Sequence, residues 1–480
     1  MTPTTILATP PRFPRLLLPA TPAADPLDLD AAVAAGAFAS LRMAIEQLKA
    51  AGVIDALTES GMRGRGTGGV PIGEKWRACA EAGTRPGPAS PAAGASAGWA
   101  GSPIGAAGPS AASISGAAEP VRYVVVNAYQ SDPAVMTDRI LLETNPYAVV
   151  EGAAIAAFAV GARQVIVALR AEATDAARAI DSAVAAAESA GYLGENVLDS
   201  GVEIRFSVRP LQGSYMLGEE TVLLKGLQGE RGQPEQQPPF TTTRGLFGAP
   251  TLIHGPQTFA AVPTILSGGI DGFPETGVRA FAGTVLVQIS GAVAHPGIAE
   301  VPFGVTLREV LDVAGGVQAP RRLKAVLIGG PSGGILPAEA IGVGFDHDSL
   351  ENAGTHLGSG SIVVLDQHSC VVDLAAVLTR FCADEACGKT IPCRIGLRRL
   401  AEIGARICEG QPRGDEIARL TDLSVDIVAS ALCDHERRAT LALLSVVRYF
   451  RDELDAHLVR NSCPAGVCHP KADARVGAVS

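Results

Sequence analysis

Gly61-Met-Arg-Gly-Arg-Gly-Thr-Gly-Gly-Val-Pro-Ile-Gly-Glu-Lys-Trp76 is the stretch of sequence that says most about the fold of this chain. Six of its sixteen residues are glycine, and Arg63, Arg65 and Lys75 give it positive charge. Glycine lets backbone amides approach an anion, and the cations neutralise that anion. The loop therefore predicts a site for a phosphate-bearing cofactor, and a flexible surface loop is the alternative interpretation.

The residues after this loop predict an α/β sheet followed by two smaller units. A Pro-, Gly-, Ala- and Ser-rich tract at residues 83–118 has no apolar period, so we expect a disordered insertion there. From about residue 120 to about 210, short β-branched strands, one of them at 164–169, alternate with helices, one of them at 174–190, which predicts an open sheet with helices on both faces. Short strands and turns follow from Gly283, and helical periodicity dominates after Asp366, including one helix expected over 439–457.

The composition argues against two classes of partner. The 480 residues carry a net charge of −10 with a pI near 5.4, so we expect no nucleic acid partner. The longest apolar stretches fall far short of the roughly 18–20 residues of a membrane helix. Because Pro10, Pro14 and Pro19 interrupt the apolar N-terminal run, we expect a flexible leader over residues 1–24 and a cytoplasmic protein.

Cysteine is concentrated near the C-terminus, which favours metal binding over a disulfide framework in a chain of this size. One set consists of Cys370, His457, Cys463 and Cys468, with the last two in Cys-Pro-Ala-Gly-Val-Cys. This spacing is acceptable for a tetrahedral Zn²⁺ site with one distant thiolate.

Further motifs follow the glycine loop in a fixed order: Val126-Asn-Ala with Asp132-Pro and Asp138-Arg139, Gly213-Ser-Tyr-Met-Leu-Gly-Glu-Glu-Thr221, Gly229-Glu-Arg-Gly232 with Pro238-Pro-Phe240, Pro250-Thr251, and Cys387-Gly-Lys-Thr-Ile-Pro-Cys393 with a later Cys433. Together they resemble the flavin-bearing, NADH-oxidising subunit of respiratory complex I and of related formate dehydrogenases and hydrogenases. The resemblance covers about residues 25–470.

This resemblance implies an α/β fold in several parts. We expect a Rossmann-like flavin domain over residues 25–278, a soluble-ligand-binding β-grasp module over 279–365, and a helical bundle with an iron–sulfur site over 366–460. A cysteine-containing tail follows at 461–480.

The resemblance also implies roles for individual residues. Those expected to bind FMN or the NADH adenine are Gly64, Arg65, Gly66, Lys75, Asn127, Tyr215, Gly218 and Phe240. The expected catalytic residues on the nicotinamide side are Glu219 and Glu220. Taken singly, each has an ordinary structural interpretation, such as a turn former, a core aromatic or a solvated helix start.

Several positions depart from the family pattern. Tyr129 and Gln130 replace acidic residues, His254-Gly255 replaces an Asn pair, and Gln233 replaces a Lys beside the adenine pocket. Each lost charge-assisted hydrogen bond typically costs roughly 1.5–3 kcal/mol, so we expect weak NADH binding.

The cluster motif departs as well, because Thr390 stands where the family has a cysteine. Three thiolates are left, from Cys387, Cys393 and Cys433. They predict a [4Fe-4S] cluster completed by Thr390, water or Cys382, or else a [3Fe-4S] cluster. Unligated helix cysteines are the alternative.

We therefore expect an electron-transfer oxidoreductase subunit of the NADH dehydrogenase type. FMN would accept hydride from NADH and pass electrons through the cluster to a ferredoxin-like or [2Fe-2S] thioredoxin-like partner subunit. The alternatives are a non-catalytic scaffold that keeps the flavin fold, and a flavoprotein with a donor other than NADH.

Overall fold

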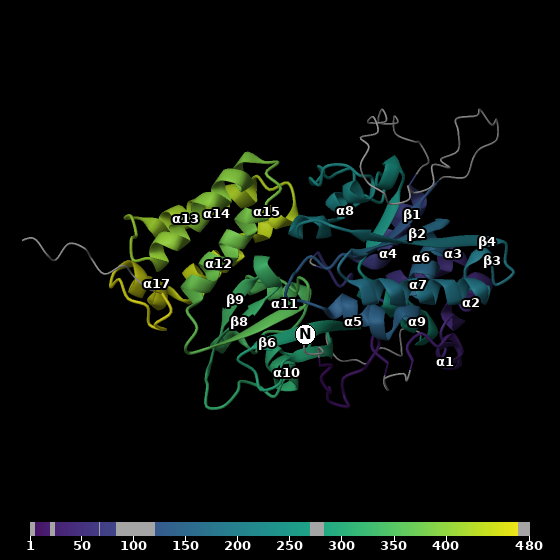
Figure 1. The fold of residues 1–480 in the computed structure, drawn as a ribbon, viewed down its shortest axis with the longest axis horizontal. Coiled ribbons are helices and arrows are strands. Elements are labelled where there is room, and N and C mark those ends of the chain that lie inside the picture. The colour runs from purple at the N-terminus through teal and green to yellow at the C-terminus, as the bar shows by residue number, and fades with distance from the viewer. Residues whose placement is uncertain (1–4, 20–24, 67, 83–120, 269–282, 469–480) are drawn as a thin grey trace, which may run out of the picture.

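The computed structural model of this chain describes residues 5–19, 25–66, 68–82, 121–268 and 283–468. Figure 1 shows an α/β domain, a second sheet beside it, and a group of C-terminal helices at the far end of the molecule. The insertion expected at 83–118 lies outside the described residues, as does most of the expected tail.

The first sheet has the strand order β3-β4-β2-β1-β5. Its strands are β1 (Tyr123–Ala128), β2 (Gln164–Arg170), β3 (Gly194–Val197), β4 (Val202–Leu211) and β5 (Thr251–His254). β1, β2, β4 and β5 run parallel, and only β3 pairs antiparallel. The middle of β2 is buried without interruption, as expected for a parallel strand covered on both faces.

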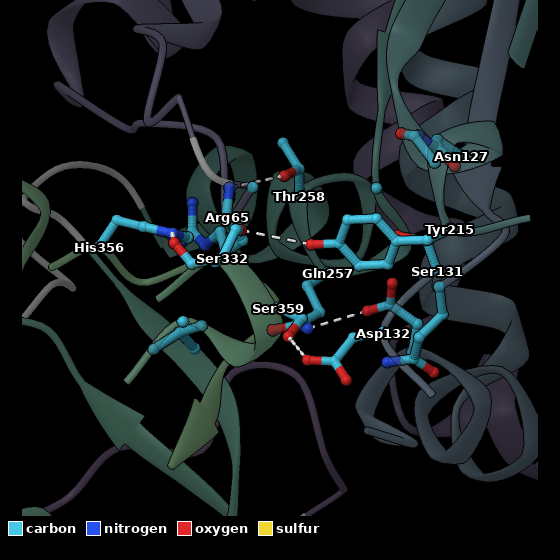
Figure 2. Close-up of a pocket in the computed structure, with 18 residues that line it drawn as sticks. Arg65, Asn127, Ser131, Asp132, Tyr215, Gln257, Thr258, Ser332, His356 and Ser359 are labelled. Atoms are coloured by element: carbon cyan, nitrogen blue, oxygen red, sulfur yellow. Dashed lines mark hydrogen bonds between the residues drawn. The ribbon is translucent and has the colours of Figure 1, made fainter. Parts of the chain in front are cut away.

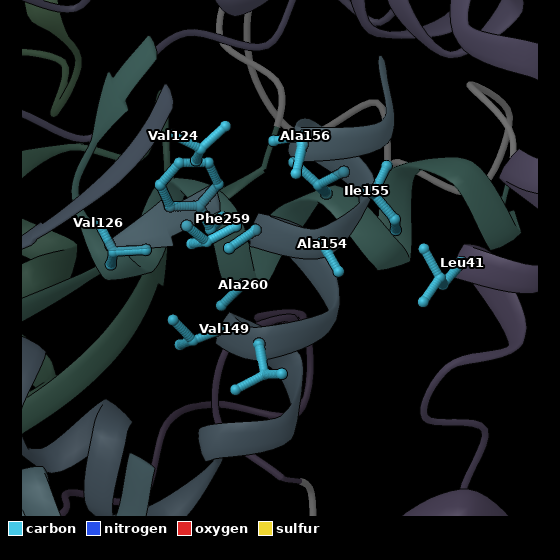
Figure 3. Close-up of a cluster of buried hydrophobic side chains, with 14 of the residues drawn as sticks. Leu41, Val124, Val126, Val149, Ala154, Ile155, Ala156, Phe259 and Ala260 are labelled. Carbon is cyan, nitrogen blue, oxygen red and sulfur yellow. The ribbon is translucent and has the colours of Figure 1, made fainter. Parts of the chain in front are cut away.

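Helices pack around this sheet, and the closest approach between them depends on a glycine. α6 (Pro146–Val160) begins with Pro146 at its first position and ends before Gly161, which adopts a left-handed conformation. A Cβ at Gly152 would lie 1.9 Å from the Phe259 carbonyl oxygen on α9 (Pro256–Gly268), so only glycine fits there. Figure 3 shows Phe259 and Ala260 packed among small residues of α6 and valines of β1.

The other helices of this domain are short or amphipathic. They are α1 (Leu29–Ala34), α2 (Ala39–Met43), the π-helix η1 (Ala44–Leu48), α3 (Lys49–Glu59), α4 (Ile72–Glu81), α5 (Thr137–Thr144), α7 (Thr174–Ser189), the 3₁₀ turns η2 (Tyr215–Gly218) and η3 (Leu246–Gly248), and α8 (Glu220–Leu227).

The second sheet has the order β7-β6-β10-β8-β9 and mixes one parallel pair, β6 with β10, with antiparallel pairs. Its elements are β6 (Thr284–Gly291), β7 (Gly297–Pro302), α10 (Leu307–Val313), β8 (Leu323–Ile328), η5 (Gly330–Ser332), β9 (Gly334–Pro337), η6 (Ala338–Ala340), α11 (His347–Asn352) and β10 (Ser361–Asp366). A capping box of Thr306 and Glu309 starts α10.

Residues 5–19 correct the expectation of a loose leader. The backbone amides of Leu16, Leu17 and Leu18 donate to the Glu300 carboxylate at 2.6 to 2.9 Å. Glu300 is only 1% exposed, and a buried carboxylate needs such donors. The segment is therefore fastened to the second sheet, a contact that spans more than 280 residues of sequence and that no local pattern indicates.

The C-terminal helices are α12 (Val371–Asp384), the π-helix η7 (Pro392–Gly396), α13 (Leu397–Cys408), α14 (Glu416–Ala429), α15 (Asp434–Arg438), α16 (Leu441–Tyr449) and α17 (Arg451–Leu458). The helix expected over 439–457 is broken at Phe450, whose φ of −124° is not helical. Among the described helices, none combines the length and the hydropathy that crossing a bilayer requires.

Candidate functional site

A cavity of about 190 Å³ lies where the first sheet meets the second. On its α/β side the cavity opens at the carboxyl ends of the neighbouring strands β1 and β5. The strand order reverses here, because β1 pairs with β2 on one side and with β5, the last strand in sequence, on the other. Such a switch point is where open α/β sheets bind ligands. Figure 2 shows side chains of the α/β domain, such as Tyr215 and Asp132, facing Ser332 and Ser359 from the segments that connect strands of the second sheet.

The cavity wall contains five residues that the sequence singled out for flavin, namely Arg65, Gly66, Asn127, Tyr215 and Gly218. The remaining wall residues are Gln130, Ser131, Asp132, Asp138, Gly255, Gln257, Thr258, Val285, Gly329, Ser332, His356, Gly358 and Ser359. The glycine loop, the end of β1 and the η2 turn thus come together at one place.

The glycine loop folds back on itself. Its turn is closed by hydrogen bonds from Gly64 N to Val70 O at 2.9 Å and from Gly69 N to Gly66 O at 3.2 Å. A Cβ at Gly69 would lie 2.7 Å from the ring of His347, so this glycine lets α11 lie against the loop. A Cβ at Gly66 would meet nothing within 4 Å, and this residue lines the cavity.

Arg65 fastens the loop to the second sheet. Its Nε donates to the Thr284 carbonyl at 3.1 Å, and its Nη1 donates to the Arg63 carbonyl at 2.8 Å. Burial lowers the pKa of Arg65 to about 9, and the nearby Glu300 carboxylate opposes this change. Arg65 is thus a buried cation in the wall between the two sheets.

Lys75, at the start of α4, pairs with Glu220 and donates to the Ile253 carbonyl at 2.9 Å. Glu219 caps α8 by accepting from the amides of Thr221 and Val222. Neither glutamate belongs to the cavity wall. Lys75 is therefore linked to Glu220, one of the two expected nicotinamide-side acids, and neither residue belongs to the cavity wall.

The other expected cofactor residues differ in their surroundings. Asn127 Nδ2 donates to the Gly218 carbonyl at 2.9 Å, which joins β1 to the η2 turn. The Tyr215 hydroxyl lies 3.3 Å from Ser332 Oγ across the cavity, and burial raises the pKa of this phenol. Phe240 is 56% exposed and stands apart from the cavity.

Sequence reasoning did not assign the polar groups that line the rest of the wall. Asp132 accepts from Ser359 Oγ at 2.7 Å, and burial raises its pKa. Asp138 accepts from Gln257 Nε2 at 2.9 Å, and burial raises its pKa to about 6 against that hydrogen bond. Both aspartates occur in motifs that match the family, and this was the one available signal.

His356 is buried, and its Nε2 lies 3.0 Å from the Ser332 carbonyl. That contact requires a proton on Nε2 and leaves Nδ1 as an acceptor, with no hydrogen-bond partner among the described residues. Burial lowers the pKa of His356 to about 3, so the ring is neutral.

The three cysteines of the cluster motif gather beside the α/β domain. Cys393 and Cys433 are buried, and Cys387 and Cys433 join an apolar cluster that includes Met216 and Leu217 of η2. The pKa of Cys393 is raised by burial and then by Glu436, Cys433 and Cys387. Burial also raises the pKa of Cys433 to about 12.

Cys382, one of the groups expected to complete the cluster, turns elsewhere and donates to the Pro331 carbonyl at 3.4 Å. Thr390 donates its hydroxyl to the Glu436 carboxylate.

The second metal-type set comes together as expected. The ligand atoms of Cys370, His457, Cys463 and Cys468 all lie within 4.8 Å of one another. His457 Nε2 is 3.5 Å from Cys370 Sγ, and its Nδ1 lies 2.8 Å from the Glu453 carbonyl. Burial would raise the pKa of Cys463, but amides at 465, 467 and 468 and the His457 ring lower it to about 6.

Comparison with known families accounts for most of this arrangement. Residues 100–264 match the Nuo51 FMN-binding domain, residues 286–336 match the SLBB domain, and residues 373–457 match the NADH-ubiquinone oxidoreductase-F iron-sulfur binding region.

Individual relatives match over most of their length. The F subunit of the NADH-quinone oxidoreductase of Mycobacterium tuberculosis is 37% identical over 412 residues, which is 86% of each chain. The NADP-reducing hydrogenase subunit HndC of Solidesulfovibrio fructosivorans is 35% identical over 92% of this chain and 83% of its own.

A crystal structure of NAD+-reducing [NiFe]-hydrogenase in the H2-reduced state superposes with a TM-score of 0.76 at 26% identity, covering 95% of this chain and 68% of that chain. The resemblance drawn from the ordered motifs is thus confirmed, and the chain belongs to the family of NADH-quinone oxidoreductase F subunits.

Proposed function

We propose that this chain is an electron-transfer oxidoreductase subunit that binds FMN in the cavity and an iron–sulfur cluster on Cys387, Cys393 and Cys433. The observation that carries the proposal is the position of Tyr215. Its ring lines the cavity and lies 5.9 Å from the ring of His435, which is two residues from Cys433. One side chain therefore spans the two expected redox sites.

The cavity wall fits a flavin in its chemistry. Gly66, Gly218 and Gly255 line the wall without side chains, so a flat ring or a phosphate could come close to the backbone there. His356 Nδ1 offers an acceptor for a hydroxyl such as those of the ribityl chain. Arg65 in the wall is proposed to supply the positive charge that a phosphate requires, together with Lys75, which lies outside the wall and pairs with Glu220.

When bound, FMN supplies the conversion of a two-electron hydride donor into one-electron steps. The chain's own residues bind and orient it. Asn127 is held by the Gly218 carbonyl, and Tyr215 is held between Ser332 and Phe381, so both are positioned before any ligand arrives. Glu219 and Glu220 are proposed to face the nicotinamide side, and Phe240 is exposed and available for stacking.

The three cysteines fit a cluster because backbone amides already point at sulfur. Lys389 N lies 3.5 Å from Cys387 Sγ, and the amides of His435 and Glu436 hydrogen-bond to Cys433. Such bonds stabilise the thiolate form that iron requires. Either a [4Fe-4S] or a [3Fe-4S] cluster is compatible with three thiolates.

We also propose that Cys370, His457, Cys463 and Cys468 bind one Zn²⁺. The contact of His457 Nδ1 with the Glu453 carbonyl places a proton there and leaves Nε2 for the metal. Glu453 is itself held by Lys324 at 2.6 Å, so the site joins α17, the second sheet and the tail. A structural rather than catalytic role follows, since four protein ligands fill a tetrahedral zinc.

The electron donor and partners are inferred from the relatives. Their names describe NADH-quinone oxidoreductase and NADP-reducing hydrogenase subunits, which supports a nicotinamide donor and partner subunits that carry electrons onward. We propose a ferredoxin-like or [2Fe-2S] thioredoxin-like partner. A cytoplasmic location would keep the nine free cysteines reduced.

The test compares Gly66→Val with Gly68→Val. Gly66 lines the cavity and a Cβ there would meet no atom within 4 Å, whereas Gly68 lies outside the cavity wall and a Cβ there would have Val70 at 3.6 Å. Both proteins should fold, and only Gly66→Val should lose flavin when purified anaerobically. Equal flavin content in the two variants would contradict the placement.

NADH should reduce the bound flavin, but only at high concentration, because Tyr129 and Gln130 replace the acids of the family pattern. Stopped-flow bleaching with NADH and NADPH measures this directly. Reduction by dithionite but by neither nucleotide would support a different donor, and a folded protein without flavin or iron would support the scaffold.

A further inference from the structure

Glu436 occupies an unusual position among the three cluster cysteines. It is 3% exposed, and its carboxylate accepts from the hydroxyl of Thr390, the residue that stands in place of the family's remaining cysteine. The same carboxylate hydrogen-bonds to Cys393, and its backbone amide hydrogen-bonds to Cys433. One side chain therefore contacts both the substituted ligand position and one of the remaining thiols.

The surroundings do not balance the charge of this carboxylate. Its other hydrogen bond comes from the Leu432 amide, and no Lys, Arg or His of the described chain forms a salt bridge with it. A buried charge is normally paired with an opposite charge or bound to a metal. An iron ion bound at this place would supply the missing positive charge.

The carboxylate also keeps free acceptor capacity. Each of its oxygens has about two acceptor positions, and Thr390 and Leu432 use one position on each oxygen. On binding iron, Cys393 would release its proton to solvent, so its contact with Glu436 would no longer occupy the carboxylate.

We infer that Glu436 is the fourth protein ligand of the cluster, with its carboxylate bound to the iron that has no cysteine and with Thr390 holding it in place. This inference rests on the proposed cluster. Non-thiolate ligands are known at iron–sulfur centres, where they raise the reduction potential, and a carboxylate oxygen is an ordinary ligand for iron. Thr390 is accordingly a positioning residue.

The experiment uses the full chain, purified anaerobically and reconstituted with ferrous iron and sulfide. Iron, labile sulfide and electron paramagnetic resonance spectra are measured for the parent, Glu436→Gln, Thr390→Cys and the double variant. Glu402→Gln on α13 serves as the control, because Glu402 pairs with Arg399 at the surface of the same bundle.

The parent and Glu402→Gln should hold about four irons per chain. Glu436→Gln should hold about three and show a three-iron signal before any oxidant is added. The double variant should regain about four irons, because the cysteine introduced at position 390 would then supply the ligand, and this recovery also shows that the Glu436→Gln fold is intact.

Two results would overturn the inference while leaving the proposed cluster standing. One is a Glu436→Gln protein with the iron content and spectrum of the parent, and the other is a parent that already holds three irons. Iron near zero in the parent and in Thr390→Cys would remove the proposed cluster itself. A further variant, Thr390→Val, measured in the same way, should keep four irons with a broadened signal. Loss of one iron in that variant is a third result that would overturn the inference, because Thr390 would then be the ligand instead.

Discussion

Glu151 is a buried carboxylate on α6 whose titration should control the stability of the α/β domain. It is 2% exposed, and it accepts from the Leu41 amide at 3.0 Å and from the amides of Phe38 and Ser40 at the start of α2. Burial raises the pKa of Glu151 from 4.5 to about 7, and the three amides oppose this rise without cancelling it.

The size of the effect follows from this change in pKa. At about 1.4 kcal/mol per pH unit, a rise from 4.5 to about 7 corresponds to about 3 kcal/mol. Because the folded pKa lies above the unfolded one, the stabilising contribution is fully present below pH 4.5. It is lost as the pH rises through 7.

The assay is urea unfolding of the parent and of Glu151→Gln at several pH values, followed by the fluorescence of Trp76, which is fully buried in this domain. Glutamine does not titrate, so any effect of its amide on the free energy of unfolding is the same at every pH and cancels when pH values are compared. The stability of the parent relative to Glu151→Gln should fall by about 3 kcal/mol between pH 4.5 and pH 8. Glu188→Gln, on the exposed side of α7, is the control.

A relative stability that rises with pH would refute this reasoning. It would mean that the three amides dominate and hold Glu151 ionised, because amide donors alone depress the pKa of a carboxylate.

Three further predictions follow from the same structure. Cys370→Ser should reduce bound zinc from about one ion per chain to near zero while Cys408→Ser retains it, and equal losses measured by metal analysis would contradict the four-ligand set. In the metal-free protein, iodoacetamide at pH 7 should modify Cys463 before Cys370. The reason is that the pKa of Cys463 is lowered to about 6, whereas burial raises that of Cys370 to about 12. Peptide mass mapping gives the order of modification. Gly152→Ala should destabilise the α/β domain by about 1–3 kcal/mol in thermal unfolding, since its methyl group would overlap the Phe259 carbonyl, and an unchanged midpoint would mean that α6 and α9 separate freely.

The fold followed from the sequence wherever burial leaves a local pattern. The strand expected at 164–169 is β2 (Gln164–Arg170), and the helix expected at 174–190 is α7 (Thr174–Ser189). β3 was not predicted, because its four residues include Gly, Glu and Asn and it is a strand only through its pairing with β4. Short edge strands carry too few buried side chains to show a period.

Only one side of the candidate site could be predicted from the sequence. Asn127 and Tyr215 lie in motifs that match the family, so their place beside the glycine loop was expected. The opposite wall comes from Ser332, His356 and Ser359, and the hydrogen bond from Ser359 to Asp132 spans 227 residues. Tertiary contacts at that separation leave no periodic or motif signal in a single sequence.

The departures from the family pattern change the charge of the cavity without closing it. Tyr129 is fully buried outside the cavity wall, where its hydroxyl donates to the Gly213 carbonyl at 2.6 Å and so steadies the segment leading to Tyr215. His254 accepts from Trp76 Nε1 at 3.1 Å, and burial lowers its pKa well below the usual value, so it is a neutral brace for α4.

Gly255 completes this pattern, because a Cβ there would have the Asn127 carbonyl oxygen as its only neighbour within 4 Å. The cavity thus keeps open space on this side, while Tyr129, Gln130 and Gly255 stand where the resemblance implies acidic or amide side chains. We expect these changes to leave space for the flavin and to weaken the affinity for NADH. The affinity for NADH, compared with the affinity for other electron donors, is therefore the property to measure first.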